Sequence, residues 1–284
     1  MQPRLDIRVM SAADLARALD WAAAEGWNPG LGDASLFQLA DPAGFIVGVL
    51  DSVPIGCVSV VRYGEALGFL GFYITIPAAR GRGHGIALWN AGMARLAGRN
   101  VGLDGVPAQQ DNYRKSGFRL AWRNIRFETA APPTPVPAPP GVTIIDAREV
   151  PFDRLAAFDR RFFAAPRDGF LAAWLSAPGH AAVAALRGDD IVALGVIRPC
   201  RTGFKIGPLF ADDRDLAAAV VAALRARAGA GTVALDVPEP NRRAVALAES
   251  LGMAPSFETA RMYTGATPAI DLDGLYGVTS FELG

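Results

Sequence analysis

The chain has 284 residues, a length that fits one large domain or two domains of ordinary size. Lysine plus arginine and aspartate plus glutamate both number 28, so the formal net charge is zero and a basic face for nucleic acid is not expected. Hydrophobic residues make up 51% of the chain. No apolar window reaches the about 18 to 20 residues of a membrane span, and the first residues lack the apolar core of a secretion signal. We expect a cytoplasmic protein without a membrane partner.

Cysteine and histidine are too scarce to build a disulfide framework or a metal centre. Cys57 and Cys200 lie far apart in apolar, strand-like runs, so free buried thiols are expected. The two histidines, His84 and His180, cannot form a histidine-rich site, and the chain has no C-x-x-C pair. The sequence therefore predicts no metal.

Apolar periodicity in the first half predicts strands and helices in alternation. The pattern predicts helices over 12–25 and 86–96, a short helix from residue 35, and strands over 45–50, 55–63, 69–76, 101–106 and 119–128. The turn-forming segment EGWNPGLGD, residues 25–33, follows the first helix. These elements predict a mixed α/β domain over residues 1–129.

A proline-rich segment separates this domain from a second set of elements. Residues 130–141 hold six of the 21 prolines, a composition typical of an extended linker. Beyond it, over 142–284, the order of the first half returns, with strands at 142–146, 181–186, 191–197, 204–210, 233–237 and 257–263 and helices at 152–163, 170–175, 216–227 and 241–252. We infer an internal duplication.

The segment ITIPAARGRGHG, residues 74–85, is the most informative part of the chain. Its strand ends at a proline, and a glycine-rich turn then leads directly into a helix. Such a turn aims unpaired backbone amides and the positive end of the helix dipole at one point. Arg80 and Arg82 add full charges. This combination predicts a pyrophosphate site.

Three kinds of phosphate loop compete for this segment. A P-loop would end in G-K-[ST], which is absent. A dinucleotide loop needs G-x-G-x-x-G, whereas Gly81, Gly83 and Gly85 are spaced G-x-G-x-G. The segment instead resembles the acyl-CoA loop of the GNAT N-acyltransferases, [QR]-x-x-G-x-[GA]. Downstream, residues 113–118 (YRKSGF) fit the Y-x-K-x-G-F element of the same family.

The resemblance implies two tandem GNAT-like domains, each with a central mixed, mostly antiparallel sheet flanked by helices. It also implies acetyl-CoA as the acyl donor and a primary amine as acceptor, most simply a small molecule, although a protein amine is possible. The protein would be a monomer or a homodimer. The residues expected to bind the cofactor are Tyr73, Ile74, Ile76, Arg80, Gly81, Arg82, Gly83, His84, Gly85 and Ser116.

By the same resemblance, Tyr113 is the expected general acid. A phenol with a pKa of about 10 can protonate a thiolate whose acid has a pKa of about 8.5. The general base stays unassigned, because residues 68–76 contain no carboxylate where family members often carry one. Asp33, Asp104 and ordered water are the candidates. The residues suggested for the acceptor side are Trp27, Asp33, Tyr63 and Asp104.

The second copy lacks the features that carry the chemistry. GPLFADDRD, residues 207–215, stands in place of the arginine–glycine loop, and its three aspartates would repel a pyrophosphate. Ala248 matches the position of Tyr113. We therefore expect a degenerate, structural copy that walls the pocket of the first. Glu258 and Arg261, on its last strand, are expected to form surface ion pairs.

Two non-enzymatic readings compete with the acyltransferase. The missing carboxylate on the central strand fits an acyl-CoA sensor that binds without catalysis. A protein-interaction module acting through the second half is the other alternative.

Overall fold

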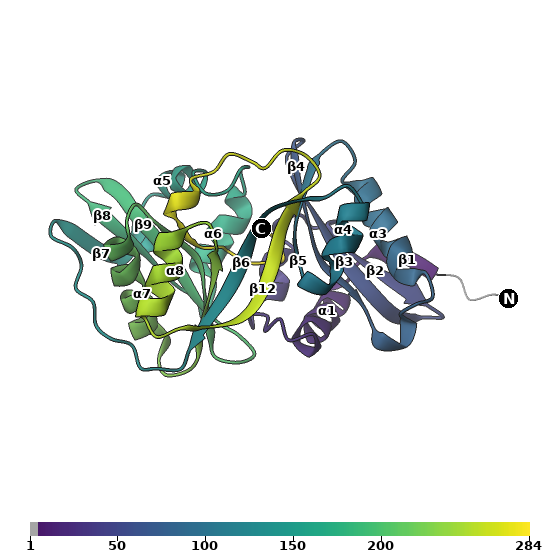
Figure 1. Ribbon diagram of the computed structural model, residues 1–284, viewed down its shortest axis with the longest axis horizontal. Helices are drawn as coiled ribbons and strands as arrows, with labels where there is room; N and C mark the ends of the chain where they lie inside the picture. Colours follow the sequence, from purple (N-terminus) through teal and green to yellow (C-terminus); the bar gives the residue numbers. More distant parts are fainter. Residues whose placement is uncertain (1–4) are drawn as a thin grey trace.

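The strands of both halves join into one mixed sheet. The computed structural model describes residues 5–284, and within them the sheet has 13 strands. Twelve follow the order β1-β2-β3-β4-β5-β12-β6-β11-β10-β9-β8-β7, and β13 pairs with β10 (Figure 1). Only β4 with β5 and β10 with β11 are parallel among the paired strands of these residues. The predicted α/β class with a mixed, mostly antiparallel sheet is confirmed.

The elements of the first half are β1 (Leu5–Val9), α1 (Ala12–Ala24), α2 (Asp33–Phe37), β2 (Phe45–Leu50), β3 (Val53–Tyr63), β4 (Leu67–Thr75), α3 (His84–Arg95), β5 (Asn100–Gly105), α4 (Gln110–Lys115) and β6 (Arg119–Thr129). Those of the second half are β7 (Val142–Asp146), α5 (Phe152–Asp159), α6 (Asp168–Ser176), β8 (Ala181–Arg187), β9 (Asp190–Pro199), β10 (Phe204–Ala211), α7 (Arg214–Ala228), β11 (Val233–Pro238), α8 (Arg242–Ser250), β12 (Ala254–Tyr263) and β13 (Leu275–Gly277). The periodicity missed β1, α4 and β13, which are short.

The two halves exchange their last long strands. β6 of the first half does not pair with β5; it pairs with β11 of the second half. β12 of the second half takes the free position beside β5. β6 and β12 also pair with each other, side by side at the centre of the molecule (Figure 1). The domain limits at residues 129 and 142 remain a prediction about where the sequence repeat begins and ends. The structure does not divide there, because strands of both halves belong to one continuous sheet.

Equivalent buried ion pairs fasten the exchanged strands. Arg261 on β12 binds Asp104 on β5 with two hydrogen bonds of 2.8 and 2.7 Å. Arg126 on β6 binds Asp236 on β11 in the same way, at 2.6 and 2.8 Å. Both aspartates follow a leucine in their strands. The expectation of a surface position was wrong for Arg261, which is 4% exposed, because β12 lies inside the joint sheet.

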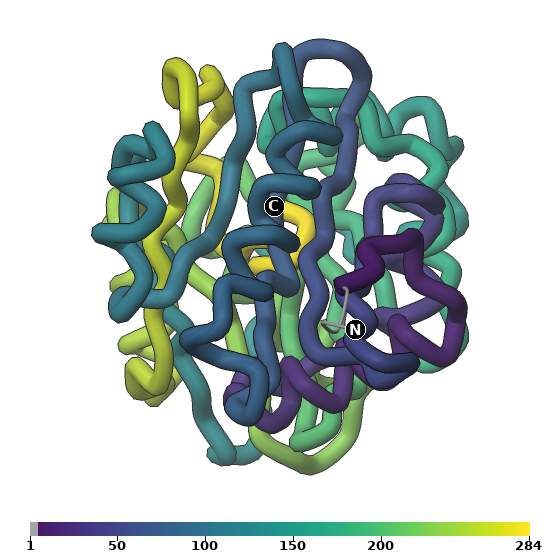
Figure 2. The backbone as a smooth tube through the Cα atoms, turned by 90° about the vertical axis from the view of Figure 1, so that its right-hand side faces the viewer, coloured from purple at the N-terminus to yellow at the C-terminus, as the bar shows by residue number. Residues whose placement is uncertain are grey.

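The last residues of the chain run back into the interior. β13 pairs antiparallel with β10, and the Val278 amide then donates to the Asp236 carbonyl oxygen at 2.9 Å. Residues 275–284 are all buried. Two perpendicular views place the C-terminus at the centre of the molecule (Figures 1 and 2). We call residues 278–284 the C-terminal tail.

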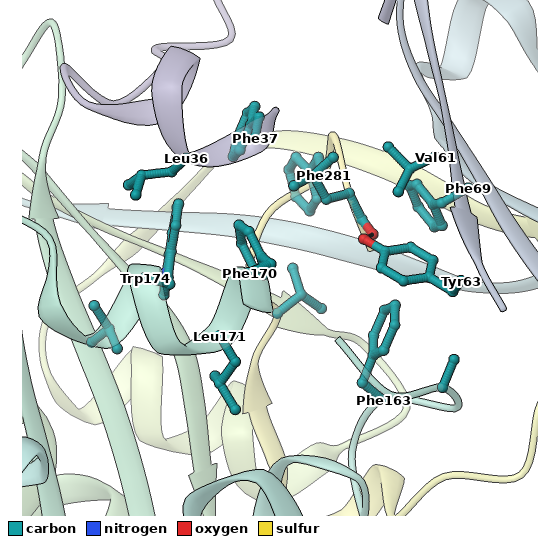
Figure 3. Close-up of a cluster of buried hydrophobic side chains, with 14 of the residues drawn as sticks. Leu36, Phe37, Val61, Tyr63, Phe69, Phe163, Phe170, Leu171, Trp174 and Phe281 are labelled. Atoms are coloured by element: carbon teal, nitrogen blue, oxygen red, sulfur yellow. Dashed lines mark hydrogen bonds between the residues drawn. The ribbon is translucent and has the colours of Figure 1, made fainter. Parts of the chain in front are cut away.

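A shared aromatic core lies on the sheet face that carries α1, α2, α5 and α6. Phe37 and Phe69 of the first half and Phe170, Trp174 and Phe281 of the second belong to this one buried cluster. Figure 3 shows these rings converging, with Phe281 of the tail among them. The halves are thus joined by a common hydrophobic core as well as by paired strands.

Candidate functional site

The arginine–glycine loop forms a tight turn that ends at an open helix N-terminus. Gly81 and Gly83 have φ of 74° and 82°, the left-handed region in which a Cβ is strained. Gly83 caps α3 without a side-chain hydrogen bond, and the first intrahelical amide is that of Ala87, which donates to the Gly83 carbonyl oxygen. The amides of residues 84–86 therefore lack intrahelical acceptors and can bind an anion.

Arg80 lies at the start of this turn, and a ligand can displace the contact that its guanidinium makes. Its Nε donates to the Thr75 carbonyl oxygen at 2.8 Å, and its guanidinium pairs with Glu25. Their side chains are 51% and 36% exposed, so the ion pair contributes little to stability and can exchange for a phosphate.

β4 and β5 separate next to this loop and leave an edge of β4 unpaired. Their parallel ladder runs from Leu67 to Leu70 on β4 and ends there. A bulge follows, in which Phe72 adopts a φ of 45° and the register against β3 shifts. Amides over residues 71–75 that face away from β3 can pair with an extended ligand or hold a developing oxyanion.

A cavity of about 650 Å³ follows this wedge from the loop to the centre of the molecule. The first half contributes the bulge, the loop glycines and the end of β5 to its wall. The second half contributes Phe257 and Thr259 from β12 and Phe281 and Glu282 from the tail. The expectation that the second half walls the pocket of the first matches this lining.

Tyr113 projects from α4 into the wall of the cavity. Its ring stacks on Trp89 at 5.6 Å between centroids and packs edge-on against Phe118 at 6.5 Å. Gly105 makes room for it, since a Cβ there would lie 2.3 Å from the ring. Burial raises the pKa of Tyr113 to about 12, so its hydroxyl stays protonated at neutral pH and can donate a proton.

The cavity brings together many of the residues expected from the sequence, but not all. Those that line it are Trp27, Tyr73, Ile74, Arg80, Gly81, Gly83, Gly85, Asp104 and Tyr113. Those outside its lining are Asp33, Tyr63, Ile76, Arg82, His84 and Ser116.

Both aspartates suggested as a base are held in buried ion pairs, although burial raises the pKa of Asp104. Asp33 is buried against Arg198, with the closest contact at 3.0 Å. Asp104 is held by Arg261 and also accepts from the Asn124 side-chain amide at 2.8 Å. A carboxylate engaged in this way cannot take a proton without losing its ion pair.

Tyr63 and Ser116 form hydrogen bonds within the protein. The Tyr63 hydroxyl donates to the Leu283 carbonyl oxygen at 2.9 Å and thereby fixes the tail. The Ser116 hydroxyl donates to the Asn112 carbonyl oxygen within the turn that ends α4.

Thr259 and Glu282 are polar residues of the cavity wall that sequence reasoning missed. The Thr259 hydroxyl is buried and has no hydrogen-bond partner in the described part of the chain. Glu282 is 4% exposed, and burial raises the pKa of its carboxyl although the charge of Lys205 opposes the shift. No sequence signal pointed to either residue, because both reach the cavity through the exchange of β12 and the return of the tail.

The corresponding wedge of the second half is filled by the chain itself. The β10–β11 ladder ends at Ile206 and Leu235, and β13 pairs with β10 beyond that point. The acidic segment there serves as a helix start, where the Asp213 side chain caps α7 by accepting from the Leu216 amide at 2.9 Å. This half lacks the open edge that the first half presents.

No helix within residues 5–284 is long and apolar enough to cross a membrane. In the same range, no three His, Cys, Asp or Glu side chains gather in a way that could hold a metal ion. Cys57 and Cys200 are buried free thiols, as predicted.

Comparisons with known proteins agree with this geometry. The profile of the acetyltransferase (GNAT) family matches residues 13–118, and that of an acetyltransferase (GNAT) domain matches residues 155–277. A holothin acyltransferase from Pseudoalteromonas sp. (strain SANK 73390) is 33% identical over 266 residues, which cover 93% of this chain and 90% of that protein.

Solved structures share the whole arrangement. A provisionally assigned acetyltransferase from Pyrococcus horikoshii superposes with a TM-score of 0.82 at 20% identity and covers 99% of this chain and 96% of that one. A tandem GNAT protein from the clavulanic acid biosynthesis pathway has a TM-score of 0.67 at 15% identity, covering 93% and 100%.

The fold and the site define an enzyme of the acyltransferase class that uses an acyl-CoA as co-substrate. The chain belongs to the GNAT acetyltransferase family and carries two GNAT domains in tandem.

Proposed function

We propose that the protein transfers an acetyl group from acetyl-CoA to the primary amine of a small molecule, by direct attack of the amine on the thioester. The observation that carries the proposal is the open wedge between β4 and β5 with the α3 N-terminus at its mouth. The enclosed aromatic end of the cavity favours a small acceptor with an apolar body. The Pseudoalteromonas relative supports this reading, because its name gives a single compound as substrate.

In this proposal the pyrophosphate binds the amides and arginines of residues 80–85. The pantetheine arm extends along the free edge of β4 at Tyr73 and Ile74, pairing as an added strand would. The thioester carbonyl then lies at the bulge near Phe72, where an unpaired amide can stabilise negative charge on oxygen.

Tyr113 is the proposed general acid for the departing thiolate. Its hydroxyl is protonated at neutral pH and lies in the wall shared by the loop and the wedge. The low-dielectric surroundings that raise its pKa also raise the proton affinity of a thiolate, so the phenol and the thiol stay comparable as acids, and a proton can pass from Tyr113 to the departing sulfur.

We further propose a non-catalytic role for the second half, because β13 fills its wedge. The free thiols and the CoA co-substrate favour a cytoplasmic protein. A monomer or a homodimer stays our expectation for the assembly.

Calorimetry with acetyl-CoA, followed by a CoA-release assay with primary amines, tests the proposal. In that assay we expect Tyr113→Phe to lower kcat by at least about 10²-fold, with the Kd for acetyl-CoA changed by less than about twofold. Tyr276→Phe is the matched control, since this buried hydroxyl of β13 has no partner within residues 5–284 and lies in the core of the second half. Unchanged turnover in Tyr113→Phe would remove this residue from the mechanism.

An acyl-CoA sensor is the second candidate, favoured by the absence of a carboxylate on β4. Tight binding of acetyl-CoA without thiol release against any amine would support it.

A further inference from the structure

We infer that Glu282, delivered by the C-terminal tail, is the general base that deprotonates the acceptor amine. The inference rests on the proposed acyl transfer and assigns the role that the sequence left open. Four features of the structure support it: the position of Glu282, its lack of an ion-pair partner, an unsatisfied hydroxyl in the same cavity wall, and its anchoring.

The tail places Glu282 directly beside the β4 bulge. Its backbone carbonyl oxygen lies so close to Gly71 that a Cβ there would approach it to 2.3 Å. Gly71 immediately precedes Phe72, the left-handed residue of the bulge. Because the thioester carbonyl is proposed to lie at this bulge, a carboxylate on the adjoining tail is within reach of an attacking amine.

Hydrogen bonds of the following residue, Leu283, fix the position of Glu282. The Leu283 carbonyl oxygen accepts from Tyr63 at 2.9 Å, and the Leu283 amide donates to the Ser280 hydroxyl at 3.2 Å. Phe281 is packed into the shared aromatic core. Such anchoring holds a catalytic group in place before substrate binds.

The cationic side chains around Glu282 bind other groups, although the Arg198 Nη1 has no hydrogen-bond partner among the described residues. Arg126 binds Asp236, and Arg198 binds Asp33. The Lys205 ammonium on β10 donates to the carbonyl oxygens of Trp27 and Asn28, at 3.4 and 3.2 Å. Glu282 itself forms no ion pair within residues 5–284, and it lines the cavity. An incoming ammonium ion can supply the missing charge.

The Thr259 hydroxyl belongs to the part of the cavity wall that the second half supplies. It is buried, lacks a hydrogen-bond partner within residues 5–284 and lies in the cavity wall on β12, two residues from Phe257, whose ring packs against that of Phe281 at 6.2 Å between centroids. A buried hydroxyl without a partner is costly, which suggests that a ligand satisfies it. Thr259 would therefore bind the acceptor, with Phe257 and Phe281 enclosing its apolar body.

Glu282 and Tyr113 together carry all the protons that move in the transfer. The Glu282 carboxylate takes one proton from the bound R–NH₃⁺, and the freed lone pair forms the C–N bond as the carbonyl electrons move to oxygen. The C–S bond then breaks, and the sulfur receives a proton from Tyr113. The nitrogen gives its second proton to the Tyr113 phenolate, and Glu282 releases its proton to solvent.

The decisive experiment measures turnover of Glu282→Gln across pH with acetyl-CoA and a panel of holothin, 2-phenylethylamine and spermidine. We expect kcat to fall by at least about 10²-fold, with the Kd for acetyl-CoA within about twofold of the wild type. The wild-type rate should rise with pH through a pKa above that of an ordinary glutamate, since the base acts deprotonated, and this limb should vanish in the variant. Glu249→Gln, an exposed change on α8, is the control.

Thr259→Val provides a second test that loss of folding cannot mimic. Removing an unsatisfied hydroxyl should leave the Tm unchanged or raise it, while KM for the amine increases severalfold. Glu282→Gln with wild-type kcat and the same pH profile would overturn the assignment. If the wild type binds acetyl-CoA but acylates no amine, the proposed function fails instead, and the two failures are distinct.

Discussion

At the residue scale, the loop glycines illustrate how backbone conformation creates a binding group. Gly83 has a φ of 82°, and a Cβ added there would have no atom within 4 Å. A side chain at this position is therefore disfavoured by the left-handed backbone conformation and not by lack of space. A residue with a Cβ pays roughly 1–2 kcal/mol for a left-handed φ. To relieve this strain the turn would rotate, and the amides of residues 84–86 would no longer point at one anion.

We therefore expect Gly83→Ala to weaken acetyl-CoA binding by about fivefold or more, the equivalent of about 1 kcal/mol of strain. Gly98→Ala is the matched control, because Gly98 has the same φ of 82° and equally open surroundings but lies beyond the far end of α3. Both variants should lose similar stability in urea, whereas calorimetry should show weaker binding only for Gly83→Ala. Equal affinities in the two variants would contradict a phosphate site at this turn.

At the element scale, the exchanged strands depend on buried charges. The side chains of Arg126 and Asp236 are 3% and 1% exposed, so each charge relies on the other for compensation. Removal of one partner leaves an uncompensated charge in the interior, which is usually far more costly than loss of the whole pair.

Arg126→Met should accordingly lower the free energy of unfolding by about 3–5 kcal/mol, measured in urea, and the double variant Arg126→Met/Asp236→Leu should recover most of that loss. Arg148→Met, which breaks a surface pair with Asp146, serves as the comparison and should cost at most about 1 kcal/mol. A double variant as unstable as the single one would show that the arginine acts mainly through packing.

At the scale of the whole molecule, the strand exchange and the buried tail make the halves one folding unit. Withdrawing β6 from the sheet would leave an unpaired edge on β11. Withdrawing β12 would leave an unpaired edge on β5. The substrate cavity is likewise incomplete without β12 and the tail.

Cleavage of the linker should therefore leave the halves associated. A protease site introduced into the exposed proline-rich residues 132–135 should yield two fragments that co-elute in size-exclusion chromatography and separate only in denaturant, with acetyl-CoA binding retained. Fragments that part under native conditions would mean that the exchanged strands contribute little to cohesion.

The sequence by itself determined the local features of this protein. Apolar periodicity predicted most strands and helices, and the turn at Gly81 and Gly83 predicted an anion-binding helix start, because both depend on neighbours along the chain. Family resemblance extended this to the fold and the acyltransferase class.

Only the tertiary structure decided where the repeat exchanges its strands and what lies at the acceptor end of the cavity. Arg261 was expected on the surface, but the structure buries it in an ion pair with Asp104. Asp104 is therefore engaged by an arginine that the sequence did not place beside it. Glu282 has no motif around it and gains its surroundings from β3, β4 and β10, which are distant in sequence. Pairing between such segments depends on the free energy of the whole core, and no local pattern encodes it.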